Sequence, residues 1–118
     1  MSQARINIAV RKPADKLCIL DIQGEISGFA EEAFGAALDA ASSNAADTII
    51  LNCTGVESMN SAGVGLLIVL LARVQLQKQR LLAYGLGNRH QQAFELAQLS
   101  EAIGLYADED EALRSLGR

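Results

Sequence analysis

The spacing of hydrophobic residues at the start of the chain predicts a pair of strands. Residues 6–10 alternate apolar side chains with polar or small ones, which is typical of a half-buried strand. Pro13 and Asp15 predict a turn. The nearly continuous apolar run over 16–22 predicts a second strand, which we expect to end at Gly24. These two strands are expected to pair as an antiparallel hairpin.

Beyond this hairpin the spacing alternates between helix and strand. The helix predicted over 30–41 carries an apolar stripe of four residues, Phe34, Ala37, Leu38 and Ala41. Asn88, with Gln91 three residues later, resembles a capping box that opens a helix through Leu96. The remaining predicted elements are strands over 48–53, 80–86 and 102–106, a helix over 61–79, and a last helix that begins near Asp108.

This order of elements, β-β-α-β-α-β-α-β-α, predicts an α/β fold. Alternation of strand, helix and strand implies parallel pairing through right-handed crossovers, and the first hairpin adds one antiparallel pair. We therefore expect a mixed sheet in a single domain over residues 1–118, without internal repeats or a linker.

Composition and charge narrow the classes of function. Half of the 118 residues are hydrophobic, which is enough for a buried core, and the net charge of −4 argues against nucleic-acid binding. Cys18 and Cys53 lie inside apolar runs and are expected to be buried free thiols. The longest apolar run, 62–72, is too short to span a bilayer, and the first ten residues are too polar for an export signal. We expect a cytoplasmic protein without a membrane span.

The sequence offers few residues for catalysis. The single histidine, His90, falls in the first turn of a predicted helix, where a solvated imidazole is the simpler interpretation. Metal-ligand spacings, a nucleophile elbow and a Walker loop are not recognisable. The turn "GLGNRH" over 85–90 follows a strand and precedes a helix, but it lacks the third glycine of a dinucleotide-binding loop. A phospho-acceptor receiver domain would need a carboxylate where Asn52 and Cys53 end the third strand. We expect no enzymatic activity, no cofactor and no metal.

The stretch "SMNSAGVGLLIVLLARVQ" over 58–75 is more apolar than one helix face requires. Ser61 is placed to be the N-cap of this helix. The arc expected to face the sheet consists of Val64, Leu67, Leu71 and Val74. Three more apolar residues, Leu66, Ile68 and Val69, lie partly off that arc. Either neighbouring helices cover them, or they form an exposed patch beside Ser61 of the kind that binds proteins.

Taken together, these motifs resemble the STAS family, the domain shared by sulphate transporters and bacterial anti-sigma-factor antagonists. Those antagonists typically show Asp-Ser-Ser/Thr-Gly-Leu-Gly before an apolar helix, and the matching residues here run from Asn60 to Gly65. "KLCILDIQGEI" over 16–26 is similar to the family's second strand, and "QAFELAQLSEAIGLYADEDEAL" over 92–113 is similar to its C-terminal part. The resemblance implies a STAS-like domain with helices packed mainly on one face of the mixed sheet.

The resemblance also implies regulation by partner switching. The family's phosphorylated serine corresponds to Ser61. In this scheme the unphosphorylated protein binds an anti-sigma factor, itself a serine kinase, and frees the sigma factor; phosphorylation reverses binding, and a phosphoserine phosphatase restores it. Asn60 and Ser27 stand where the family usually has aspartates associated with the partner interface. The implied partner-binding residues are Ser27, Gly28, Asn60, Ser61, Ala62, Val64, Gly65, Ile68 and Asn88.

Two other functions remain open on the sequence. The chain could be a STAS subunit of a stressosome-type complex or of a lipid- or anion-transport system, which neighbouring transporter genes would favour. It could also bind a small ligand or nucleotide at the "GLGNRH" turn, which nucleotide binding that depends on Gly87 would favour.

Overall fold

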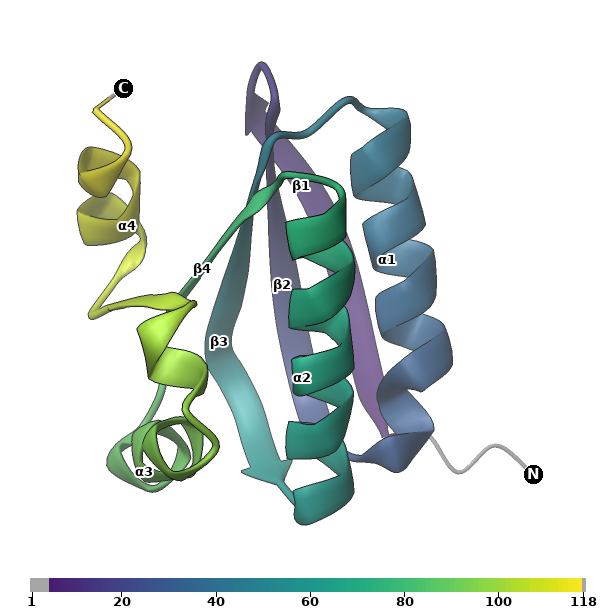
Figure 1. The fold of residues 1–118 in the computed structure, drawn as a ribbon, viewed down its shortest axis with the longest axis vertical. Helices are drawn as coiled ribbons and strands as arrows, with labels where there is room; N and C mark the ends of the chain where they lie inside the picture. Colours follow the sequence, from purple (N-terminus) through teal and green to yellow (C-terminus); the bar gives the residue numbers. More distant parts are fainter. Residues whose placement is uncertain (1–4, 118) are drawn as a thin grey trace.

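The computed structural model describes residues 5–117 and shows an α/β fold built on one five-stranded sheet (Figure 1). The strands lie in chain order across the sheet; the first two pair antiparallel and all other neighbours pair in parallel. They are β1 (Ile6–Ala14), β2 (Leu17–Ile26), β3 (Thr48–Met59), β4 (Arg80–Tyr84) and β5 (Gly104–Tyr106). The predicted mixed sheet with an antiparallel first hairpin is confirmed.

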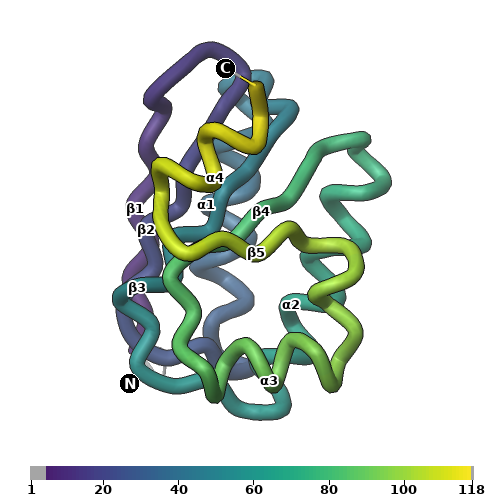
Figure 2. The backbone as a smooth tube through the Cα atoms, turned by 90° about the vertical axis from the view of Figure 1, so that its left-hand side faces the viewer, coloured from purple at the N-terminus to yellow at the C-terminus, as the bar shows by residue number. Residues whose placement is uncertain are grey.

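Helices cover the two faces of the sheet unequally. They are α1 (Glu31–Ser43), α2 (Ser61–Leu76), α3 (Asn88–Leu96) and α4 (Glu109–Ser115), with short 3-10 turns η1 (Gly28–Ala30) and η2 (Leu99–Glu101). The first three helices pack on one face, whereas α4 lies on the other, in front of the sheet in Figure 2 with α1 behind it. Within residues 5–117, no helix combines the length and apolar character needed to cross a bilayer.

Alternation of side chains along the central strands separates two cores. On β2, Cys18, Leu20 and Ile22 point into the larger core beneath α1, α2 and α3, while Leu17 and Ile19 point into the smaller core beneath α4. The strand is therefore apolar on both faces, as its nearly continuous apolar sequence indicated. The predicted stripe of α1 is buried in the larger core, with Phe34, Ala37, Leu38 and Ala41 at 3 % exposure or less.

The hairpin differs from the prediction at its turn. β1 continues through Pro13 to Ala14, with a register shift after Arg11, and the turn falls at Asp15 and the residue that follows. Proline is tolerated here because β1 is an edge strand, where a missing N–H can face outward, and because the irregular pairing relaxes the need for a donor.

β2 and β3 are both longer than predicted. Gly24 does not end β2; it lies inside the strand with φ of +109°, and a β-carbon there would come within 2.0 Å of the Arg5 carbonyl oxygen. Glycine is therefore required by the close approach of β1, not by chain termination. β3 runs past Cys53 to Met59, and its last residues pair with the end of β2. This extension brings the ends of both strands to the start of α2.

Candidate functional site

Ser61 is the first residue of α2, and it does not cap the helix. The N-cap is Asn60, whose side-chain oxygen accepts a hydrogen bond from the Gly63 backbone N–H at 2.8 Å. The prediction that Ser61 supplies the cap was therefore wrong by one residue. The extended backbone at Asn60 places its side chain over the first turn of the helix, as a cap requires. Ser61 is exposed, and its hydroxyl makes no hydrogen bond within the described residues 5–117.

The start of α2 is fixed by close packing on the end of β2. A β-carbon on Gly63 would lie 2.0 Å from the carbonyl oxygen of Ile26, so the helix reaches this position only with glycine. The Asn60 N–H donates to the same carbonyl at 3.2 Å. Next to it, a β-carbon on Gly28 would lie 3.3 Å from the β-carbon of Ala62. The loop after β2 and the first turn of α2 therefore form one continuous surface around Ser61.

The outer side of α2 remains apolar. Its buried residues are Gly63, Leu67, Leu70 and Val74. Leu70 thus takes the core position that the sequence pattern assigned to Leu71, which is half-buried, as is Val64. Ile68 and Val69 keep 46 % and 64 % of their surfaces exposed. Of the three residues that the pattern left open, Ile68 and Val69 form an exposed apolar patch, whereas Leu66 is half-buried and packs against the core.

Ser27 and Gly28 lie on the loop beside the first turn of α2, whereas Asn88 belongs to a different element. Ser27 caps η1, its hydroxyl accepting from the Phe29 N–H at 3.2 Å, and Gly28 abuts the first turn of α2 as described above. The residues of the sequence-derived set from Asn60 to Ile68 follow along α2 itself. The structure therefore gathers eight of the nine residues, from Ser27 to Ile68, on α2 and the loop beside it.

Asn88 is exposed at the first position of α3, and the predicted capping box does not form. Gly87 is the N-cap, without a side-chain hydrogen bond, and the Gln91 amide donates instead to the Leu86 carbonyl at 3.0 Å. The Gln91 side chain is thus bonded to a residue that precedes the helix and does not bond to the cap residue. Arg89 and His90 line a hollow of about 160 Å³ against the last residues of β3, and Asn88 does not line it.

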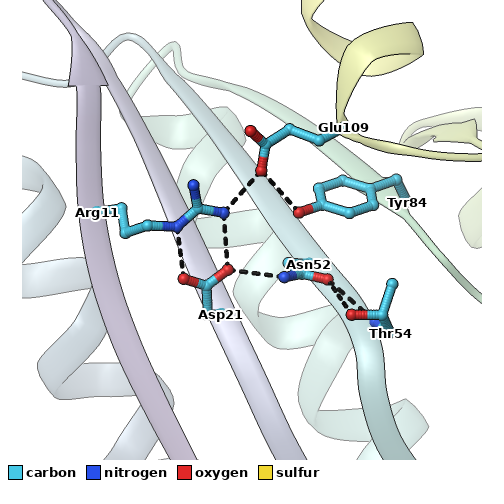
Figure 3. A network of polar contacts seen from close by, with 6 residues as sticks. All are labelled: Arg11, Asp21, Asn52, Thr54, Tyr84 and Glu109. Carbon is cyan, nitrogen blue, oxygen red and sulfur yellow. Dashed lines mark hydrogen bonds and ion pairs between the residues drawn. The ribbon is translucent and has the colours of Figure 1, made fainter.

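A polar network that the sequence did not predict lies on the opposite face of the sheet (Figure 3). Arg11 holds Asp21 through two hydrogen bonds of 2.5 and 2.9 Å and donates to Glu109 of α4 at 2.7 Å. The Tyr84 hydroxyl donates to the same Glu109 oxygen at 2.9 Å, and the Asn52 amide donates to Asp21 at 2.7 Å. Asp21 and Asn52 stand side by side in the register of β2 and β3. The sequence signal that could have indicated this network is a polar residue, Asp21 or Asn52, within each of two apolar strands.

The network sets the charge states of its members. Hydrogen bonding from Arg11 holds the pKa of both carboxyl groups, Asp21 and Glu109, below their ordinary values. Burial, and then the neighbouring Glu109 carboxylate, raise the pKa of Tyr84 to about 12. The site is thus a fully ionised triad of Arg11, Asp21 and Glu109 with a neutral tyrosine. It attaches α4 to the sheet, and each of the six residues drawn in Figure 3 makes at least one hydrogen bond within the network.

Both cysteines are buried, which makes their thiols unreactive. Cys18 and Cys53 are buried free thiols, as predicted, and burial raises the pKa of Cys53 to about 12. Among residues 5–117, no group of three or more His, Cys, Asp or Glu side chains is arranged to hold a metal ion.

Comparisons with known proteins bear on this arrangement. The family model described as STAS domain matches residues 6–112. An anti-sigma factor antagonist from Mycobacterium paratuberculosis matches with a TM-score of 0.79 and 19% identity over 96% of this chain and 95% of that chain. A sulfate transporter family protein from Wolinella succinogenes matches with a TM-score of 0.76 and 19% identity over 89% and 88% of the two chains.

Structures of SpoIIAA match in both of its states. The phosphorylated form of this Bacillus cell fate determinant has a TM-score of 0.71 and 22% identity, covering 93% of this chain and 99% of that chain. The unphosphorylated form of SpoIIAA, an anti-sigma factor antagonist, has a TM-score of 0.72 and 18% identity, covering 95% and 98%. No curated protein sequence matches this chain significantly. At these identities the solved structures establish the fold.

Proposed function

The chain belongs to the STAS domain family, and from that premise we propose that it is an anti-sigma-factor antagonist that works by partner switching. In its unphosphorylated form it binds an anti-sigma factor that is also a serine kinase, and the sigma factor is released. Phosphorylation of Ser61 ends this binding, and a phosphoserine phosphatase restores it. The chain acts in the cytoplasm and has no enzymatic activity of its own.

One observation carries the proposal: the Ser61 hydroxyl is exposed, unused by the fold and bordered by apolar surface. Capping is done by Asn60, so modification of Ser61 removes no contact that holds the helix. Ile68 lies on the exposed side of the next turns, with Val69 beside it. A kinase can therefore reach the hydroxyl, and a partner can cover the patch next to it.

A phosphate at this position changes binding more than folding. The first turn of a helix presents backbone N–H groups and the positive end of the helix dipole, which stabilise an anion. The same phosphate adds about two negative charges beside a surface that binding must desolvate, which is unfavourable. The matches to SpoIIAA in both states, with TM-scores of 0.71 and 0.72, are consistent with a switch that leaves the fold in place.

The residues proposed to contact the partner are those that surround Ser61 or follow it on α2. Ser27 and Gly28 lie on the loop that packs against Ala62, and Gly65 and Ile68 continue the exposed side of the helix. Asn60 serves as cap and borders the serine. Asn88 of α3 is proposed only as a peripheral contact, because the residues of α3 that face the end of β3 are Arg89, His90 and Ala93.

A binding experiment tests the proposal. The wild-type chain is used as bait in native lysate, and the captured serine kinase is then purified for titration against wild type, Ser61→Ala and Ser61→Asp. We expect wild type and Ser61→Ala to bind equally and Ser61→Asp to bind about tenfold more weakly or worse. With ATP, mass spectrometry should locate the phosphate on Ser61, and Ser61→Ala should stay unmodified.

Two results would contradict the proposal. Phosphate on Ser58 or Ser43 with Ser61 unmodified would place the switch elsewhere in the chain. Capture of membrane-transport subunits in place of a kinase would favour the second candidate, a STAS subunit of a transport assembly, for which the match to a sulfate transporter family protein is the supporting observation.

A further inference from the structure

A shallow trough lies along the outer side of α1, next to the surface around Ser61. Its volume is about 660 Å³. Both ends connect to α2, one through the contact of Gly28 with Ala62 and the other through an ion pair of Asp39 with Arg73 at 2.5 Å. The residues that line it are Gly28, Phe29, Glu31, Glu32, Gly35, Ala36 and Asp39.

Phe29 is an exposed aromatic residue at one end of this trough. It keeps 61% of its surface exposed, although Ile26, three residues before it, and Ala30, directly after it, are fully buried. Its backbone N–H is bound by Ser27, so the local turn fixes the position from which the ring projects. Aromatic residues, phenylalanine among them, are enriched at the cores of protein–protein interfaces.

Gly35 is a glycine in a helix interior that the packing of this chain does not explain. Helix-interior glycine weakens a helix relative to alanine, and such a residue usually has a packing or functional reason. At Gly63 the reason is evident, because a β-carbon would meet the Ile26 carbonyl. At Gly35, apart from its chain neighbours and the backbone of its own helix, no atom of the described residues lies within 4 Å of where a β-carbon would be. The missing side chain keeps the middle of the trough open.

The trough is acidic. Glu31 and Glu32 are both exposed in the first turn of α1, and neither forms an ion pair within residues 5–117. Asp39 is already paired with Arg73. A second copy of this chain would bring the same acidic surface and a net charge of −4 against it, so the occupant that fits is a basic segment of another protein.

We propose that this trough is a second part of the partner-binding surface, which receives a segment of the anti-sigma factor. That segment places an apolar side chain against Phe29, brings its backbone close to Gly35, and carries Arg or Lys side chains opposite Glu31 and Glu32. The proposal rests on the proposed function, and the contact of Gly28 with Ala62 makes the trough continuous with the surface around Ser61.

Titration of the purified kinase with four variants tests the trough. Phe29→Ala removes the aromatic ring, Gly35→Leu fills the trough from a position with open space, and the double variant Glu31→Gln/Glu32→Gln removes its charge. Leu96→Ala is the matched control, because Leu96 is an apolar residue with 88% exposure on α3. We expect affinity losses of about tenfold for Phe29→Ala and Gly35→Leu, and less than about twofold for Leu96→Ala.

Additional measurements separate binding from stability and identify the occupant. Melting temperatures should be unchanged for Phe29→Ala and equal or higher for Gly35→Leu, because neither touches the core. Raising the salt concentration should weaken wild type more than the Glu31→Gln/Glu32→Gln variant. Sedimentation of the wild-type chain alone should show no self-association that depends on Phe29.

The outcomes distinguish the trough from the switch at Ser61. If Ser61→Asp abolishes binding while Phe29→Ala and Gly35→Leu bind like wild type, the trough proposal is overturned and the proposed function stands. If wild type itself binds no anti-sigma factor, both fail together. A wild-type dimer that Phe29→Ala dissociates would show that the occupant is a second copy, which also overturns this proposal.

Discussion

The carbonyl oxygen of Ile26 occupies the space where a β-carbon on Gly63 would lie, and this contact joins the end of β2 to the first turn of α2. Gly63→Ala must therefore move the helix start, and we expect it to lower the free energy of unfolding by about 1–3 kcal/mol. Gly65 lies one half-turn further with open space around it. Gly65→Ala should raise that free energy by up to about 1 kcal/mol. Chemical denaturation measures both, and equal effects of the two substitutions would contradict the proposed packing.

A second prediction separates the roles of Asn60 and Ser61. Asn60→Ala removes the side-chain oxygen that accepts from the Gly63 N–H, and it should lower the free energy of unfolding by about 1 kcal/mol. Ser61→Ala removes an exposed hydroxyl that caps nothing and should change it by less than about 0.5 kcal/mol. The reverse order in urea unfolding would show that Ser61 is the cap after all.

The residue before the proposed phosphorylation site should also influence the kinase. Asn60→Asp restores the aspartate that the family usually carries there, keeps an oxygen able to accept from the Gly63 N–H, and should leave the melting temperature unchanged. We expect the rate of Ser61 phosphorylation by the purified kinase to increase. Ser27→Asp, at the other position where the family has an aspartate, is a useful comparison. A rate equal to that of wild type would show that the aspartate has no role here.

Neighbouring residues on α2 offer a test of the apolar patch. Ile68 is 46% exposed, whereas Leu67 is 1% exposed. Ile68→Glu should weaken partner binding by about tenfold, or about 1.4 kcal/mol, with little change in melting temperature. Leu67→Glu buries an unpaired carboxylate and should destabilise the fold by several kcal/mol. A large loss of stability in Ile68→Glu would mean that this side chain belongs to the core.

The attachment of α4 should weaken in acid. Asp21 and Glu109 have pKa values below those of unfolded carboxyl groups, so their contribution to stability is full above about pH 4.5 and is lost as the pH falls through their folded values. The ion pairs are partly exposed, which limits the contribution to about 1 kcal/mol. Glu109→Gln should make stability less dependent on pH between about 5 and 3. An unchanged pH profile in urea unfolding would show that this network does not couple to folding.

The fold could be predicted from the sequence because the periodicity of most segments is unambiguous. The stripe that begins at Phe34 is buried as predicted, and the order of elements is confirmed. The strand ends were less predictable, because glycine and proline usually interrupt strands, and Gly24 and Pro13 were interpreted in that way. Here tertiary contacts decide: Gly24 accommodates the approach of Arg5, and Pro13 lies in an edge strand.

The position of the candidate site at the start of a helix could be predicted from the sequence, but the hydrogen bonds at that helix start could not. A serine at a helix start predicts a cap, and only the backbone conformation shows that Asn60 takes this role. The trough beside α1 could not be inferred either, because the pattern does not tell whether Gly35 faces a neighbour or solvent. Likewise Arg11 and Glu109 are 98 residues apart in sequence, so no local spacing could pair them.

The placement of α4 on the face of the sheet opposite α2 has a practical consequence for measuring the proposed partner exchange. In Figure 1 α4 lies beyond the sheet from α1 and α2. The sheet therefore separates α4 from Ser61 at the start of α2. A fluorescent reporter fused after α4 would therefore project away from the proposed partner-binding surface around Ser61. Energy transfer to a labelled kinase could then record association and release in real time without obstructing either event.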